Sequence, residues 1–127
     1  NSVPKFQVFN SALLSALHGK TYEQAFTDSK LWGRWVETAV GAYLINNAEP
    51  LGYKLYYWRE ASNEVDYILE RRGETIAIEV KSGHRTTNKG ITLFRERYNP
   101  RHAIIVGSGG ISIEDFLQFD LEKLWVL

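Results

Sequence analysis

Asp66, Glu79 and Lys81 carry side chains that could together bind a metal ion and stabilise negative charge beside it. They lie in two consecutive segments that alternate between polar and apolar residues, which predicts a pair of neighbouring strands. If the turn between these strands is centred between Arg72 and Gly73, Asp66 lies directly opposite Glu79. Two facing carboxylates repel each other and raise each other's pKa, so we expect a cation between them.

Carboxylate oxygens are hard ligands of the kind that Mg²⁺ prefers, with water and a substrate phosphate completing the octahedron. The exposed end of a strand can add a backbone carbonyl, which we assign to Val80. Lys81 follows Glu79 by two residues on the same face of its strand, so its ammonium group could hold a water or a phosphate beside the ion. The sequence therefore predicts a site for Mg²⁺, or for Mn²⁺, ligated by Asp66, Glu79 and Val80.

The same residues allow a second interpretation, in which they form a solvated polar face. Lys81 would then pair with Glu64, and Asp66 would be an ordinary surface carboxylate. Ile68 and Ala77 lie on the same face as the charges, which predicts that this face is partly covered and favours the first interpretation. The opposite face of the hairpin is predicted to be continuous apolar core, formed by Val65, Tyr67, Leu69, Ile76, Ile78 and Val80.

Glu37 is a third candidate carboxylate, and it lies on the clearest predicted helix, residues 29–47. That helix is predicted from apolar residues at steps of three and four, namely Trp32, Trp35, Val36, Ala39, Val40 and Tyr43. Glu37 lies beside this stripe, with Gly33 and Gly41 one turn away on either side, so its carboxylate could point into a recess. The alternative is that Glu37 pairs with Arg34 or lies in water at the edge of the stripe.

A basic segment follows the predicted metal site. The chain has 15 Lys and Arg against 15 Asp and Glu, yet six basic residues and a single acid lie between Lys81 and His102. Such local clusters bind phosphate backbones, and the candidate contacts are Arg85, Lys89, Arg95 and Arg97. The alternative is a basic helix face without a partner. The glycine-rich residues 107–110 lack the spacing and the lysine of a P-loop, which favours a plain turn.

Length and composition exclude several classes of protein. The chain has 127 residues, enough for one domain with a real core, and no apolar run approaches the roughly 18 residues of a membrane span. The absence of cysteine excludes disulfides, thiolate catalysis and cysteine-ligated zinc, and it fits a reducing cytoplasm. The sequence has no methionine, even at its start, which predicts a fragment of a longer protein.

The remaining segments predict an α/β domain. In chain order we expect a strand over residues 5–9, helical turns over 12–17 and 21–28, the helix over 29–47, strands over 53–58, 64–70 and 75–81, a helix over 91–98 and a strand over 102–106. Asn99 and Pro100 end the second of the two longer helices. Ser112 and Asp115 resemble a capping box, which predicts a last helical turn through Leu117.

The order helix, three strands, helix, strand, with these acids in place, resembles the PD-(D/E)XK nuclease superfamily. Its restriction-endonuclease-like core, α-β-β-β-α-β, would cover roughly residues 29–106 of a single domain, with a mixed sheet flanked by helices. The resemblance implies that Asp66 and Glu79 are metal ligands. It further implies that Lys81 is the catalytic cation and that Glu37 supports the metal or its waters.

A longer set of segments resembles the C-terminal domain of a large group of prokaryotic AAA-type ATPases, in which an ATPase module and a winged-helix segment precede a nuclease-like domain. These segments are Gly33–Glu37, Tyr57–Arg59, Asn63–Tyr67, Glu79–Gly83 and Val106–Gly110. The resemblance implies that the chain is the C-terminal fragment of such an ATPase, with the ATPase and winged-helix parts as its partners.

The two resemblances together imply a cytoplasmic, Mg²⁺-dependent nuclease domain that hydrolyses DNA phosphodiesters. An alternative is a catalytically silent domain of the same fold that binds DNA, or that docks on and regulates its own ATPase module. A third interpretation is an assembly module, in which the Trp-rich helix and the apolar residues 124–127 form a homodimer contact.

Overall fold

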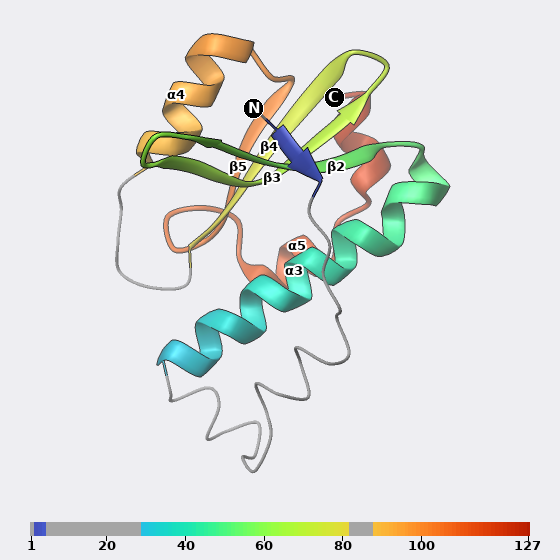
Figure 1. Ribbon diagram of the computed structural model, residues 1–127. Helices are drawn as coiled ribbons and strands as arrows, with labels where there is room; N and C mark the ends of the chain where they lie inside the picture. Colours follow the sequence, from blue (N-terminus) through green and yellow to red (C-terminus); the bar gives the residue numbers. More distant parts are fainter. Residues whose placement is uncertain (1, 5–28, 82–87) are drawn as a thin grey trace.

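The computed structural model describes residues 2–4, 29–81 and 88–127. These residues form an α/β fold, a five-stranded mixed sheet flanked by helices (Figure 1). The strands are β1 (Ser2–Pro4), β2 (Lys54–Glu60), β3 (Asn63–Arg71), β4 (Glu74–Lys81) and β5 (His102–Gly107). The helices are α3 (Ser29–Leu51), α4 (Lys89–Tyr98), α5 (Ile113–Gln118) and the 3-10 helix η1 (Leu121–Trp125). The predicted order α-β-β-β-α-β is confirmed from α3 to β5.

The predicted elements are confirmed with shifted ends. α3 begins at Ser29 but continues four residues beyond the expected Asn47, with Pro50 in its last turn and Gly52 in the left-handed region at φ 71°. The cap of α5 is as predicted, because the Ser112 hydroxyl accepts a hydrogen bond from the Asp115 N–H at 3.1 Å. The elements predicted over residues 5–28 lie outside the described residues.

The sheet is antiparallel from β1 to β4, and β5 joins β4 in parallel. Arg72 and Gly73 both have positive φ, 52° and 80°, as a two-residue hairpin turn with the twist of the flanking strands requires. The β3–β4 ladder runs from Arg71 opposite Glu74 to Tyr67 opposite Ile78, which confirms the predicted register. The ladder ends there, one residue before Asp66 and Glu79.

A bulge in β3 corrects one prediction about the hairpin faces. Tyr56 pairs with Ile68 but Trp58 pairs with Val65, so Tyr57 stands opposite two residues of β3. An extra residue on one strand reverses the alternation of its side chains beyond that point. Val65 therefore packs with Trp58 and Ile68 on the α4 side of the sheet, and the prediction that it shares a face with Tyr67 was wrong.

Two apolar layers cover the sheet, with α3 and α4 on opposite sides (Figure 1). On one side α3, α5 and η1 pack over β3, β4 and β5, with Val36, Val40 and Leu44 of α3 buried as the predicted stripe requires. On the other side α4 contributes Ile91 and Phe94 to a smaller cluster. The face that carries the candidate site is thus partly covered by α4.

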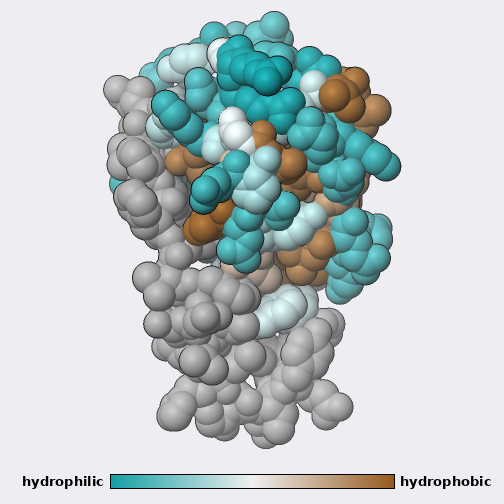
Figure 2. Space-filling view, turned by 90° about the vertical axis from the view of Figure 1, so that its right-hand side faces the viewer, coloured by the Kyte–Doolittle hydropathy of each residue, from teal (hydrophilic) through white to brown (hydrophobic). Residues whose placement is uncertain are grey.

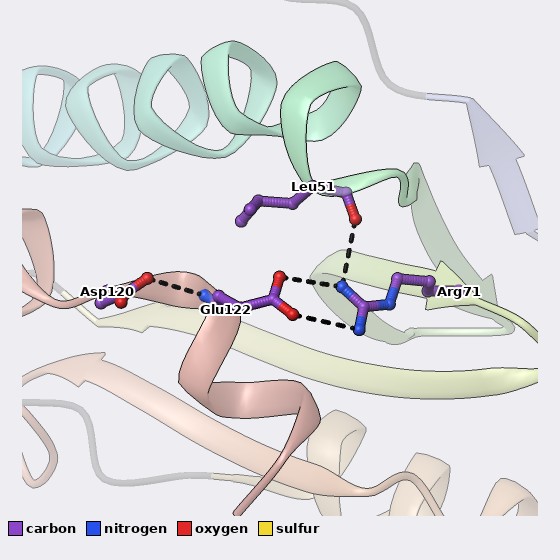
Figure 3. A network of polar contacts seen from close by, with 4 residues as sticks. All are labelled: Leu51, Arg71, Asp120 and Glu122. Carbon is purple, nitrogen blue, oxygen red and sulfur yellow. Dashed lines mark hydrogen bonds and ion pairs between the residues drawn. The ribbon is translucent and has the colours of Figure 1, made fainter.

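The C-terminal segment is tied to the sheet by a polar network around Arg71 (Figure 3). The Arg71 guanidinium donates to both carboxylate oxygens of Glu122, at 3.0 and 3.3 Å, and to the Leu51 carbonyl at 3.1 Å. It also lies 4.9 Å from the centre of the Trp125 ring. Asp120 caps η1 by accepting from the Glu122 N–H at 3.1 Å. Within the predicted apolar tail, Leu124 and Trp125 are therefore core of their own domain, whereas Val126 and Leu127 are exposed.

Hydrophilic residues predominate on the face drawn in Figure 2, and apolar residues there form separate patches. The large apolar residues most exposed in the described part of the chain are Tyr98, Val126 and Leu127. A homodimer contact through the tail stays a prediction. None of the helices within residues 29–81 and 88–127 combines the length and the apolar character that crossing a bilayer requires.

Candidate active site

Asp66 and Glu79 lie where the two strands separate, and each carboxylate accepts a hydrogen bond from the opposite strand. The Asp66 N–H donates to Glu79 Oε1 at 3.2 Å, and the Val80 N–H donates to Asp66 Oδ2 at 2.8 Å. The side chains thus take the place of the backbone ladder that ends at Tyr67 and Ile78. This confirms that the two carboxylates face each other, as the register predicted.

Burial and the neighbouring acid keep a proton on this pair. Glu79 is 9% exposed. Its burial, its hydrogen bond with the Asp66 side chain and the Asp66 charge raise its pKa from 4.5 to about 8, while Lys81 and the Asp66 N–H oppose the rise. The raised pKa therefore favours the protonated form of Glu79 at neutral pH. A divalent cation can replace that proton and satisfy both charges.

Lys81 lies beside the pair, at the edge of a pocket. Its Nζ is 3.9 Å from Glu79 Oε2, and its side chain is 19% exposed. The pocket, about 470 Å³, is lined by Ser62, Asn63, Glu64, Glu79, Lys81, Lys89 and Gly90. Glu64 pairs with Arg59 at 3.6 Å, so the alternative pairing of Lys81 with Glu64 is not the one that forms.

Two glycines allow close backbone approaches beside this pocket, and neither role was predicted from the sequence. A side chain at Gly107 would overlap the backbone carbonyl of Lys81, and Gly107 also has φ 110°. A side chain at Gly90 would overlap the carbonyl of Glu64. The Ser108 N–H donates to the Lys81 carbonyl at 3.0 Å, so residues 107–110 form the plain turn that was favoured, and this turn anchors Lys81.

The oxygen atoms at the Asp66–Glu79 pair suit a cation that keeps several water ligands. The Val80 N–H points toward β3, where it donates to Asp66. Because the N–H and C=O of one strand residue point toward the same neighbouring strand, the Val80 carbonyl faces the space between β3 and β4 too. Within the described residues no group of three or more His, Asp or Glu could hold a metal ion together. Two carboxylates, a carbonyl and open space suit Mg²⁺, which dehydrates reluctantly, better than a metal that needs a full protein cage.

Glu37 lies on the other side of the sheet from α4. Its backbone carbonyl accepts a hydrogen bond from the Tyr67 hydroxyl at 3.3 Å, so α3 passes β3 next to Asp66. Glu37 does not complete a group of three acids with Asp66 and Glu79 in the described part of the chain. Its predicted role in supporting a metal or its waters stays a prediction.

The predicted nucleic-acid contacts are distributed along α4. Lys89 lines the pocket at the start of the helix, while Arg95 and Arg97 are exposed in its last turn. Arg97 forms an ion pair with Glu60 of β2, which holds the end of α4 against the sheet. Arg85 lies outside the described residues.

Comparison with known protein families gives one match. Residues 32–117 match the family described as "Domain of unknown function (DUF4143)". The chain belongs to this family. The DUF4143 match begins within α3 and ends in α5, so it includes the carboxylate pair, Lys81 and the whole pocket. No curated protein and no solved structure matches the chain significantly.

Proposed function

We propose that this DUF4143 domain is a metal-dependent nuclease of the PD-(D/E)XK type that hydrolyses DNA phosphodiesters. The observation that carries the proposal is the pair formed by the half-buried Asp66 and the buried Glu79, with Lys81 Nζ 3.9 Å from Glu79 at the edge of an open pocket. Like charges are rarely buried together without a function, because the arrangement costs stability. The order of elements and the resemblance to the superfamily agree with this function.

Each residue of the pair has a defined part in the proposed reaction. Asp66 and Glu79 would hold a Mg²⁺ or Mn²⁺ ion together with the Val80 carbonyl. When bound, such an ion supplies a Lewis acid that activates water and neutralises charge on phosphate oxygens. Lys81 would donate a hydrogen bond to the phosphate and stabilise the charge that develops on it. Glu37 would orient water from the α3 side.

The substrate would approach along α4. Lys89 lies on the pocket, and a phosphate placed there would also be near the first N–H groups of α4, where no side chain caps the helix. Arg85, Arg95 and Arg97 would add weaker contacts. We further propose that the domain works in the cytoplasm, attached to an AAA-type ATPase and a winged-helix segment of the same protein. The lack of cysteine agrees with a reducing compartment.

Calorimetric titration with Mg²⁺ and Mn²⁺ tests the metal site. We expect the wild type to bind, and Asp66→Ala and Glu79→Ala to lose binding. Glu64→Gln is the matched control, because Glu64 lines the same pocket but pairs with Arg59, and it should bind as the wild type does. The titration is then repeated with a DNA duplex present. Failure to bind in both titrations would reject the nuclease proposal.

A second candidate is a silent domain of the same fold that docks on its own ATPase module or binds DNA without cutting it. What favours it is that both carboxylates already accept backbone N–H donors, so the pair also closes the gap between β3 and β4. Under this proposal Asp66→Asn leaves every activity of the full-length protein intact. DNA cleavage by the wild type in Mn²⁺ would decide against it.

A further inference from the structure

A second pocket lies at the opposite end of α4, far along the same face of the sheet from the carboxylate pair. It measures about 450 Å³ and is lined by Tyr56, Trp58, Ile68, Glu70, Gly73, Thr75, Phe94 and Tyr98. Four of these residues are aromatic, and one is acidic. Neither the proposed nuclease reaction nor the basic residues of α4 use this pocket.

The aromatic rings form one connected cluster. Trp58 contacts Phe94 edge to face with ring centres 5.4 Å apart, and it contacts Tyr98 in the same way at 6.3 Å. Phe94 and Tyr98 are 4.7 Å apart. Trp58 and Phe94 are 2% and 4% exposed, whereas Tyr98 is 49% exposed. The pocket therefore has a fixed aromatic floor and one accessible aromatic wall.

Among the described residues that line this pocket, Glu70 alone carries a charge. Glu70 is half-buried and forms no ion pair or side-chain hydrogen bond with any described residue. Lys54 stands opposite Glu70 in the β2–β3 ladder but makes no salt bridge with it in the described structure. The last turn of α4 ends at Tyr98 and carries Arg95 and Arg97, which offset the negative end of the helix dipole. The Glu70 carboxylate and the aromatic ring faces attract cations and repel phosphate.

The hydrogen-bonding capacity of the pocket selects the kind of cation. The lining side chains offer few acceptors besides the Glu70 carboxylate, the Thr75 hydroxyl and the Tyr hydroxyls. A primary ammonium group, as in Lys, would bury about three N–H donors there, and a guanidinium group, as in Arg, would bury about five. A trimethylated ammonium has no N–H donors and presents methyl groups to the rings.

We propose that this second pocket binds a methylated ammonium group, with Tyr98 and the Trp58–Phe94 floor against the methyl groups and Glu70 facing the charge. This site is separate from the proposed nuclease site and does not depend on it. The group could belong to a free small molecule or to a methylated lysine side chain, and both present the same trimethylammonium chemistry.

The test uses the whole 127-residue chain and follows the indole N–H resonance of Trp58 by NMR during titration. The probes are choline, Nε-trimethyllysine amide and 3,3-dimethyl-1-butanol, the uncharged isostere of choline. We expect saturable shifts with one or both cations and at least roughly tenfold weaker binding of the neutral isostere. Tighter binding of choline or of the lysine derivative identifies the source of the group, and either result supports the site.

Variants at the rim test the roles of the residues without disturbing the floor. Tyr98→Leu and Glu70→Gln should each weaken binding about fivefold or more, whereas Tyr98→Phe should stay within about twofold. Glu74→Gln is the control, since Glu74 pairs with Arg101 and does not line this pocket. Equal binding of the neutral isostere, or no saturable shift with either cation, would overturn the proposal. A response to adenosine but to neither cation would overturn it in favour of a base-binding pocket.

Discussion

The β3–β4 hairpin carries a cluster of charged side chains at each end, and opposite charges meet at one end whereas like charges meet at the other. At the turn end, Arg71 is 16% exposed and meets a carboxylate of opposite charge on Glu122. The Leu51 carbonyl and the Trp125 ring occupy the rest of its surroundings. Each of these contacts favours the charged guanidinium, so groups of the protein itself compensate the charge of Arg71 (Figure 3).

At the open end of the hairpin, Asp66 and Glu79 carry the same charge. Their partners are two backbone N–H groups and Lys81 at 3.9 Å, and these do not prevent the pKa of Glu79 from rising to about 8. A proton or another cation between the two acids stabilises the pair further. The same β3–β4 ladder positions both clusters. The cluster at the turn end stabilises the fold, and the cluster at the open end could be stabilised further by a bound cation.

The largest expected effect is on catalysis at the open end. If the nuclease proposal is right, Lys81→Ala and Asp66→Asn should each lower metal-dependent DNA cleavage by about 100-fold or more, because they remove charge stabilisation and a metal ligand. Cleavage of supercoiled plasmid in Mn²⁺ measures this. Lys123→Ala, an exposed lysine of η1, serves as the control. Wild-type cleavage rates in both site variants would show that the pair is not catalytic.

The second largest effect is on stability at the turn end. Arg71→Ala should lower the free energy of unfolding by about 2–3 kcal/mol, since it removes three hydrogen bonds and the contact with Trp125. Urea denaturation measures the loss. Arg71→Lys should recover part of it, because lysine keeps the charge without the two-pronged contact to Glu122. Metal affinity should not change, and a change would show that the two ends are coupled.

The pH dependence of stability distinguishes the two ends in a third way. The pKa of Glu79 is raised from 4.5 to about 8, so between these values the folded protein holds a proton that the unfolded chain releases. Stability of the metal-free protein should therefore fall as pH rises through this window, by roughly 2 kcal/mol. Glu79→Gln should abolish this fall, because glutamine imitates the protonated acid.

Denaturation at several pH values in EDTA measures this difference. Mg²⁺ should raise the stability of the wild type at pH 8.5 and leave that of Glu79→Gln unchanged. Arg71→Ala serves as the matched comparison, since it should keep the pH dependence of the wild type. A wild type whose stability is level from pH 5 to pH 8.5 would contradict the raised pKa of Glu79.

Local patterns in the sequence were sufficient to predict the hairpin. The alternation of β3 and β4 and the Arg72–Gly73 turn fix the register, and extending that register one residue beyond the ladder predicts Asp66 opposite Glu79. The same alternation gave the wrong face for Val65, because a bulge leaves no mark in the alternation of polar and apolar residues. The bulge coincides with the point where the strands separate, so the error lies next to the site.

Features that depend on distant contacts were not predictable in this way. Nothing in the spacing indicates that Arg71 meets Glu122 or that Gly107 must lack a side chain to approach the Lys81 carbonyl. The acidic aromatic pocket combines β2, β3 and α4, so its lining is scattered along the sequence. A glycine in the first turn of a helix, as at Gly90, was the one available signal, because glycine disfavours helices.

The smallest expected effect is on stability at the Arg101–Glu74 ion pair, and it tests whether the length of an ion pair or its burial decides its contribution. Arg101 and Glu74 also join at the turn end of the hairpin, at 2.8 Å, which is shorter than the 3.0 Å between Arg71 and Glu122. Arg101 has side-chain exposure of 29%, and its other partner is the carbonyl of the exposed Leu127. Arg101→Ala should therefore cost only about 0.5–1 kcal/mol in the same urea experiment. A cost equal to that of Arg71→Ala would mean that the length of the pair, and not its burial against Trp125, decides its contribution.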